Sequence, residues 1–310
     1  MRPWIGILQV TPVMMCMFMP KVGRCEWFDW DNKQIKNLSF IHVNFLGDSC
    51  CNPFSLGAII LRLKLALPRV HVHSLQIGNN IIEDTLNGFL MHPDKQIEIA
   101  CNAIKSDPLL ANGYNAIGYS QGAQFLRGLA QRCPEPQMKT LVSLGGQHQG
   151  VYGLPGCDAL NSKFCDRIRP IISNLAYLSL AQNRLVQATY WHDPINKTAY
   201  IYGNTYLADI NNEYIVNETY IKNLQSLENI VFIIFEKDDM VQPIESEWFG
   251  FYKEGQSRET ESLQESHVYK RLGLDKMDEE KKLHFLSTPG NHLELNWSWF
   301  LENVINKFFK

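Results

Sequence analysis

The sequence lacks the features that mark several classes of protein. Its eight cysteines include no Cys-x-x-Cys pair, so neither a zinc ribbon nor a thioredoxin-type redox site is predicted. It has no run of basic residues and a formal net charge of −3, which argues against a nucleic-acid partner. Beyond the N-terminal segment, no apolar run has the length of a membrane span, so no transmembrane anchor is predicted. Internal repeats and low-complexity segments are also missing, which excludes a repeat architecture.

The residues that are present favour a large domain made in an oxidising compartment. The chain has 310 residues, of which 45% are hydrophobic, and this suits one large domain or a core domain with an insertion. Residues 1–25 have a basic start and a mostly apolar body, and we interpret them as a signal peptide or an atypical N-terminus. The cysteines and four Asn-x-Ser/Thr sequons point to a secreted or luminal protein. Among the sequons, Asn196 and Asn217 are the expected glycosylation sites.

Strand and helix patterns alternate along most of the chain. Apolar or alternating runs predict strands at 38–46, 69–77, 114–120, 139–146, 229–236 and 282–288. Amphipathic runs predict helices at 56–67, 95–107, 121–132 and 298–309. Such alternation indicates an α/β fold, with a mostly parallel central sheet flanked by helices. Between about 147 and 228 the strand pattern disappears, so we expect one domain over 26–310 with a largely helical insertion, or cap, before the last strands.

The stretch Gly118-Tyr-Ser-Gln-Gly122 places Ser120 between a predicted buried strand and a predicted helix. A serine with glycines two residues to either side, on a strand-to-helix turn, is typical of a nucleophile elbow. The turn pushes the hydroxyl out above the carboxyl end of the sheet, and the helix N-terminus favours developing negative charge. The backbone N–H of Gln121 is then in place to bind an oxyanion. A plain tight turn is the alternative interpretation.

A serine nucleophile needs a base and an acid that orients the base. On this fold the expected chain order is serine, then acid, then histidine, with the acid and the histidine on loops after later strands. The run 229–236 is followed by Asp238 and Asp239, which spacing alone does not separate. The last strand leads into a Pro-Gly-Asn loop that presents His292. These positions predict a Ser-His-Asp triad.

Six of the other histidines are assigned by their place in the pattern. Four lie in predicted strands and are interpreted as structural: His42, His71, His73 and His284. His148 and His192 belong to the insertion or its edges, where contact with substrate stays an open alternative.

Several motifs in order resemble the palmitoyl-protein thioesterases, the lysosomal enzymes that remove fatty acyl groups from cysteine. The longest is GYSQGAQFLRGLAQRCPEPQMKTLVSLGGQHQGVYGLPGC. The others are GDSCCNP, RLVQATYWHDPI, LADIN, ESEWFGFY and GNHLEL. The similarity extends from about Gly47 to the C-terminus. It implies an α/β-hydrolase fold and hydrolysis of palmitoyl thioesters on the cysteines of proteins or peptides, in the lysosome after passage through the secretory pathway, with secretion as a further destination.

The resemblance also implies roles for individual residues. Ser120 would be the nucleophile, Asp238 the acid and His292 the base, which resolves the choice between Asp238 and Asp239. Leu46 would supply the second oxyanion amide beside that of Gln121. The implied disulfides are Cys50–Cys51, Cys101–Cys133 and Cys157–Cys165. An apolar groove for the acyl chain would recruit parts of 147–228. No metal and no organic cofactor is expected.

One segment departs from the family pattern. The family has Trp-His-Gly-Met before the GDSCC motif, whereas this chain has Val43-Asn44-Phe45-Leu46. A phenylalanine in place of glycine narrows the backbone conformations open to the segment that would carry an oxyanion amide. Two alternatives to a thioesterase therefore stay open. One is an oxyester lipase or esterase on the same triad, and the other is an inactive acyl-binding relative.

Overall fold

The central element of the fold is a parallel sheet. The structure is a computed structural model and describes residues 39–43, 56–68, 70–155 and 162–309. Within these residues, six strands form the main sheet in the order β2-β1-β3-β4-β5-β8, and every pairing is parallel. The strands are β1 (Ser39–Val43), β2 (His71–Ser74), β3 (Tyr114–Tyr119), β4 (Met138–Leu144), β5 (Asn229–Phe235) and β8 (Leu283–Thr288). The predicted α/β fold is confirmed.

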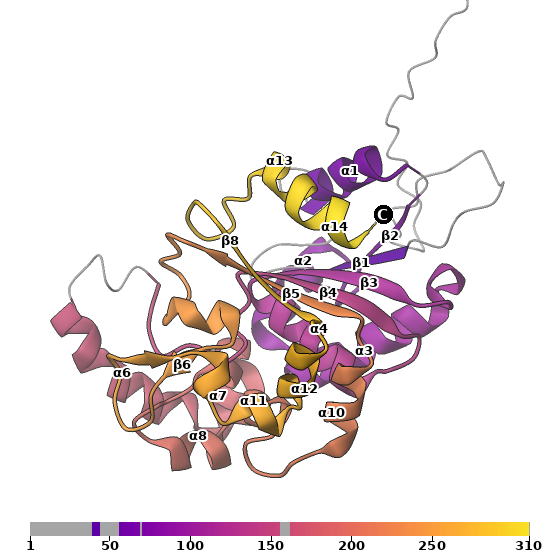
Figure 1. Cartoon of the computed structure of the whole chain (residues 1–310). Helices are drawn as coiled ribbons and strands as arrows, with labels where there is room; N and C mark the ends of the chain where they lie inside the picture. Colours follow the sequence, from indigo (N-terminus) through magenta and orange to yellow (C-terminus); the bar gives the residue numbers. More distant parts are fainter. Residues whose placement is uncertain (1–38, 44–55, 69, 156–161, 310) are drawn as a thin grey trace, which may run out of the picture. The chain divides into compact units, whose positions relative to one another are not determined.

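Helices cover both faces of this sheet (Figure 1). On one face lie α1 (Leu56–Ala66) and the C-terminal helical run of α13 (Trp297–Phe300), η5 (Leu301–Ile305) and α14 (Asn306–Phe308). On the other face lie α3 (Pro93–Ser106), α4 (Gln121–Arg132), α10 (Glu218–Gln225) and α12 (Leu274–Glu279). The helix α2 (Ile81–Leu90) was not predicted, and it begins where the Asn80 side chain accepts a hydrogen bond from the Glu83 N–H.

Strand residues alternate between two hydrophobic cores because successive side chains of a strand point to opposite faces. Ala116 of β3 packs into the core that contains α4, whereas Ile117 packs into the core that contains α1. In β5, Phe232 and Ile233 divide in the same way. Burial on both faces explains why these strands read as continuous apolar runs in the sequence.

The segment between β4 and β5 is helical, as the sequence predicts. Its elements are α6 (Ser162–Ala176), α7 (Ser179–Arg184), η2 (Val186–Tyr190), α8 (Lys197–Gly203), α9 (Leu207–Ile210) and α10. The bounds of the insertion, 147–228, stay a prediction. Between β5 and β8 lie η3 (Ile244–Trp248), the hairpin of β6 (Phe251–Tyr252) and β7 (Thr260–Glu261), η4 (Leu263–Glu265), α11 (Val268–Arg271) and α12. None of the described helices has the length and apolar character needed to span a membrane.

One implied disulfide is present, Cys101–Cys133, which ties α3 to the residue that ends α4. Cys165 is disulfide-bonded as well. Its implied partner Cys157 lies outside the described residues, as do Cys50 and Cys51.

Candidate active site

Ser120 stands at a strained corner between β3 and α4. Its backbone has φ 50° and ψ −125°, which a residue with a side chain rarely adopts. The corner also needs glycine at position 118, because a Cβ there would lie 2.5 Å from the Cα of Ala123. Although Ser120 is the N-cap of α4, its side chain makes no capping hydrogen bond. The hydroxyl is therefore directed to another partner.

That partner is His292, on the loop that follows β8. The Ser120 hydroxyl and His292 Nε2 are 3.0 Å apart, within hydrogen-bond distance. On the other side of the ring, His292 Nδ1 hydrogen-bonds Asp238 Oδ2. The two carboxyl-end loops after β5 and β8 meet here because β5 and β8 are neighbours in the sheet. The three residues predicted as a triad are thus brought together.

The second oxygen of Asp238 is also held in place. Asp238 Oδ1 accepts hydrogen bonds from the backbone N–H groups of Met240 and Val241, at 2.7 and 3.0 Å. Burial alone would raise the pKa of Asp238, but hydrogen bonds from His292 and Glu247 outweigh it and lower the pKa below its ordinary value. Its neighbour Asp239 is exposed to solvent. Of the two aspartates, Asp238 faces the histidine as a carboxylate.

Glu247 is a site residue that the sequence reasoning missed. It lies in η3, is 0% exposed, and its Oε2 accepts a hydrogen bond of 3.0 Å from the Phe235 N–H. Burial, together with the hydrogen bond to Asp238 and the negative charge of Asp238, raises the pKa of Glu247 well above its ordinary value. No donor among the described residues faces Glu247 Oε1. The raised pKa favours the protonated form of Glu247, which can donate to Asp238.

No spacing rule could have singled out Glu247. The residue belongs to the ESEWFGFY motif, and no chemical pattern in that stretch distinguishes it from Glu245 two residues earlier. The contact arises because η3 folds back onto the end of β5, where Phe235 is its backbone partner.

The residues next to the His292 ring are tightly packed. A Cβ added to Gly145 would lie 3.3 Å from His292 Cε1 and 3.2 Å from the Phe235 ring. Gly145 itself has φ +64°, a conformation that glycine adopts without strain. The absence of a side chain at this position leaves room for the imidazole to sit between Ser120 and Asp238.

Of the two predicted oxyanion donors, Gln121 lies within the described residues and Leu46 does not. Gln121 is the first residue of α4, next to Ser120, and its side chain is tied by Nε2 to the carbonyl of Gly88 at 3.0 Å. Its backbone N–H belongs to the free first turn of the helix, where amides attract negative charge. Leu46 lies outside the described residues, together with Asn44 and Phe45. The oxyanion roles of Gln121 and Leu46 therefore stay predictions.

His148, for which substrate contact is an open alternative, is fully buried. Its Nδ1 accepts from Arg127 Nε at 3.3 Å, and its Nε2 lies 2.8 Å from the Ser143 hydroxyl. Burial and the nearby Arg127 charge hold the pKa of His148 well below its ordinary value. His148 is thus a neutral link between α4 and the segment after β4.

His192 is likewise mostly buried. Its ring is stacked between Tyr200 and Phe251, with centroids 3.8 and 4.1 Å away. Its Nδ1 donates to the Gln149 carbonyl at 2.7 Å. Burial lowers the pKa of His192 to about 4, so the ring is neutral at physiological pH.

A pocket of about 260 Å³ lies elsewhere. Its lining includes His192, Asp193, Lys197, Glu261, Glu265 and His267. Ser120 and His292 do not line it, and its charged walls do not suit an acyl chain. The residues of the expected acyl groove are therefore not identified by this pocket.

Comparison with known proteins decides the family. The family model described as "Palmitoyl protein thioesterase" matches residues 40–292, which is most of the chain and includes Ser120, Asp238 and His292. The chain belongs to the palmitoyl protein thioesterase family. Membership confirms the expected enzyme class, a thioester hydrolase, and the α/β-hydrolase fold.

Two relatives match nearly the whole chain. Palmitoyl-protein thioesterase 1 of Caenorhabditis elegans is 48% identical, over 97% of this chain and 100% of its own length. Lysosomal thioesterase PPT2-B of Xenopus laevis is 28% identical, over 95% of this chain and 94% of its own length. The expectation that similarity to the palmitoyl protein thioesterases starts near Gly47 is wrong. The family model starts at Phe40, and the first alignment must include most of the residues before Gly47.

Solved structures give a more distant likeness. The monoacylglycerol lipase of Paleococcus ferrophilus matches with a TM-score of 0.42 and 15% identity, over 86% of this chain and 90% of that chain. At this distance the likeness says nothing about activity.

Proposed function

We propose that this palmitoyl protein thioesterase uses Ser120, His292 and Asp238 to hydrolyse long-chain acyl thioesters on the cysteines of proteins and peptides. The observation that carries the proposal is the unbroken hydrogen-bond chain from the Ser120 hydroxyl through His292 to the buried Asp238. Family membership supplies the thioester as the bond that is broken.

The first half of the reaction forms an acyl-enzyme. Ser120 Oγ attacks the thioester carbonyl carbon while its proton passes to His292 Nε2. The carbonyl oxygen becomes an oxyanion, which the backbone N–H of Gln121 binds, with Leu46 as the second proposed donor. The tetrahedral intermediate then breaks its C–S bond. His292 gives the proton to the departing sulfur, so the cysteine leaves as a thiol and the acyl group stays on Ser120.

The second half releases the fatty acid. Water attacks the Ser120 ester as His292 Nε2 takes a proton from it, and the C–O bond to serine breaks as the proton returns to Ser120 Oγ. Asp238 keeps the Nδ1 proton of His292 in place throughout, so that Nε2 is free to accept. These steps need only side chains, backbone amides and water.

A lysosomal location and glycosylation belong to the same proposal. The Xenopus relative is named as a lysosomal thioesterase, and the sequons and disulfides agree with passage through the secretory pathway. Asn196 is exposed at the N-cap of α8 and Asn217 is half-buried at the N-cap of α10. Both caps use the Oδ1 atom, whereas a glycan is attached through the amide nitrogen.

Turnover of paired substrates tests the proposal. The purified protein and its Ser120→Ala variant are each given a palmitoyl thioester and a palmitoyl oxyester. The two substrates differ only in whether sulfur or oxygen carries the acyl group. We expect preferred hydrolysis of the thioester and none in the variant. Faster oxyester cleavage would favour the lipase alternative. Saturable binding of fatty acid without turnover would favour the acyl-binding alternative raised by Asn44-Phe45.

A further inference from the structure

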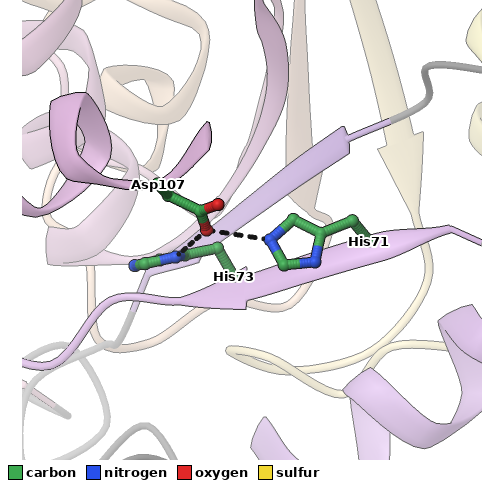
Figure 2. Close-up of side chains that lie close together, drawn as sticks. All are labelled: His71, His73 and Asp107. Atoms are coloured by element: carbon green, nitrogen blue, oxygen red, sulfur yellow. Dashed lines mark hydrogen bonds and ion pairs between the residues drawn. The ribbon is translucent and has the colours of Figure 1, made fainter. Parts of the chain in front are cut away.

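Three side chains outside the proposed active site converge on one point at the edge of the sheet. His71 Nε2 and His73 Nδ1 lie 2.9 and 2.8 Å from the same oxygen, Asp107 Oδ2 (Figure 2). One nitrogen of each ring and one carboxylate oxygen lie within 4.8 Å of one another. We propose that His71, His73 and Asp107 form a binding site for a divalent transition-metal ion such as Zn²⁺.

The fold places these residues together by simple geometry. His71 and His73 are two apart in β2, so both side chains point to the same face of the strand. Among the described strands, β2 is at the edge of the sheet, and its side chains are partly exposed. Asp107 ends α3 and caps η1 (Pro108–Leu110), just before β3.

The carboxylate is oriented before any ion arrives. Asp107 Oδ1 accepts a hydrogen bond of 3.0 Å from the Leu109 N–H, which turns Oδ2 toward β2. Hydrogen bonds of this kind, to the atom of a ligand that does not face the metal, fix the direction of the ligating atom. The histidines therefore approach an oxygen that is held by the backbone.

The two nitrogen–oxygen distances suit a metal ion with only a small adjustment. Bonds of about 2.0–2.1 Å place neighbouring ligand atoms about 2.9 Å apart at right angles, and about 3.4 Å apart at the tetrahedral angle. The observed nitrogen–oxygen separations of 2.9 and 2.8 Å match the first value and are about 0.5 Å short of the second. Side chains that are 14–26% exposed can move by this amount.

The donor set selects the class of ion. Two imidazoles and one carboxylate suit Zn²⁺ and its first-row neighbours, whereas Mg²⁺ and Ca²⁺ prefer sites made of oxygen atoms. A neutral imidazole keeps its single proton on the ring nitrogen that does not bind the ion. Water can reach the partly exposed side chains and fill the remaining coordination positions.

The cluster lies at the opposite end of the sheet from Ser120. His71 is in register with Ser39, the first residue of β1, and Phe40 of β1 is in register with Asn115 of β3. Ser120 follows the last residue of β3, at the carboxyl end. An ion bound here would tie the edge strand to the α3–β3 connection and act on stability rather than on turnover.

Metal titration of the whole chain tests the site. The protein is freed of metal with EDTA, and Zn²⁺ alone is added at pH 7.5 while binding is followed by calorimetry and by thermal unfolding. We expect Zn²⁺ to raise Tm by about 4 °C at 100-fold excess over its dissociation constant, and Mg²⁺ to leave it unchanged. His73→Gln and Asp107→Asn should each weaken binding at least tenfold, which at the same Zn²⁺ concentration would reduce the Tm shift to about half or less.

A matched control separates this site from other histidines. His284 also lies in a strand and is half-buried, but it hydrogen-bonds Asn229 rather than an acidic group, so His284→Gln should bind Zn²⁺ like the unchanged protein. Thioester turnover of the metal-free His73→Gln variant should be unchanged. Absence of saturable Zn²⁺ binding, or equal binding and an equal Tm shift in His73→Gln and Asp107→Asn, would overturn the proposal. So would Zn²⁺ binding that inhibits turnover and persists in both variants, because it would place the ion at His292.

Discussion

Glu247 lies against Asp238, and the two buried carboxyl groups share a hydrogen bond. Their pKa values are shifted in opposite directions: that of Asp238 is lowered, which favours the carboxylate, and that of Glu247 is raised, which favours the neutral acid. Like charges so close together would not both ionise. The proposed triad therefore has a second buried carboxyl group beside it, whose raised pKa favours the neutral form.

Replacing Ser120 with alanine should abolish hydrolysis without affecting the fold. The nucleophile would be lost, and removal of a triad member typically lowers the rate by about 10⁴–10⁶. Thermal unfolding should match that of the unchanged protein, because the hydroxyl is replaced by hydrogen at a site that makes no capping bond. Ser287→Ala, at an exposed serine on β8, is the control and should keep full activity. More than a tenth of the activity in Ser120→Ala would contradict the assignment.

Replacing each of the two neighbouring aspartates with asparagine should have very different effects on turnover. Asp238→Asn should lower turnover by about 10⁴, because the His292 ring would no longer be held in the right tautomer. Asp239→Asn should change turnover little, since that side chain is exposed and its backbone N–H, not its carboxylate, contacts Asn291. The measurement is kcat/KM for a palmitoyl thioester. Equal losses of kcat/KM in the two variants would contradict the assignment of Asp238 as the acid that orients His292.

Comparison of Glu247→Gln with Glu247→Ala should show whether Glu247 positions Asp238 as a neutral hydrogen-bond donor or only fills space. The amide of glutamine can accept from the Phe235 N–H and donate to Asp238, so we expect activity within about threefold of the unchanged protein. Alanine leaves the buried Phe235 N–H without its partner, which typically costs about 1–3 kcal/mol, and it removes one group that holds Asp238. Its kcat should fall more than its KM rises. If glutamine were as damaging as alanine, Glu247 would have to act in its charged form.

The raised pKa of Glu247 gives stability a pH dependence with a definite sign. The folded protein holds this proton more tightly than the unfolded chain, whose ordinary glutamate value is 4.5. Its contribution to stability is complete below that value and is lost as pH rises toward the folded pKa, by about 1.4 kcal/mol per pH unit. Denaturant unfolding from pH 4 to pH 7 should show this loss. In Glu247→Gln the slope should be shallower, and an unchanged slope would mean that Glu247 is ionised.

The pKa shift of Asp238 gives stability the opposite dependence on pH. Its lowered pKa means that its contribution is present above the ordinary aspartate value of 3.8 and is lost as pH falls below it. The loss of stability due to Glu247 thus occurs as pH rises above 4.5, and the loss due to Asp238 occurs as pH falls below 3.8.

Loss of the Cys101–Cys133 disulfide should lower the free energy of unfolding by about 2–4 kcal/mol. The bond closes a loop between residues 32 apart in the sequence and so restricts the unfolded chain. Denaturant unfolding of the Cys101→Ala/Cys133→Ala variant measures the loss. Mass spectrometry of unreduced peptides should recover the linked pair, and it should also show Cys165 joined to another cysteine. Free thiols at Cys101 and Cys133 in protein from a secretory host would rule this out.

Much of this protein could be predicted from local patterns. The strands β3, β4 and β5 are buried on both faces, so each reads as an apolar run bounded by turn residues, and each was found nearly where expected. Helix α4 spans 121–132 as predicted, because the glycine-flanked serine marks its start and the pattern ends at Cys133. Ser120 and His292 follow from the same logic, since residues placed just after parallel strands collect at one end of the sheet.

Other features depend on contacts between distant segments. Spacing could not choose between Asp238 and Asp239, whereas the folded loop turns one carboxylate toward His292 and leaves the other in solvent. Glu247 reaches Asp238 only because η3 packs against the end of β5, and its neutral state follows from burial that no local pattern reveals. His71 and His73 read as ordinary strand residues until Asp107, more than thirty positions away, is brought between them. The sequence by itself therefore determined the sheet and the order of the proposed triad, while tertiary packing decided which acidic groups meet and in which direction their pKa values shift.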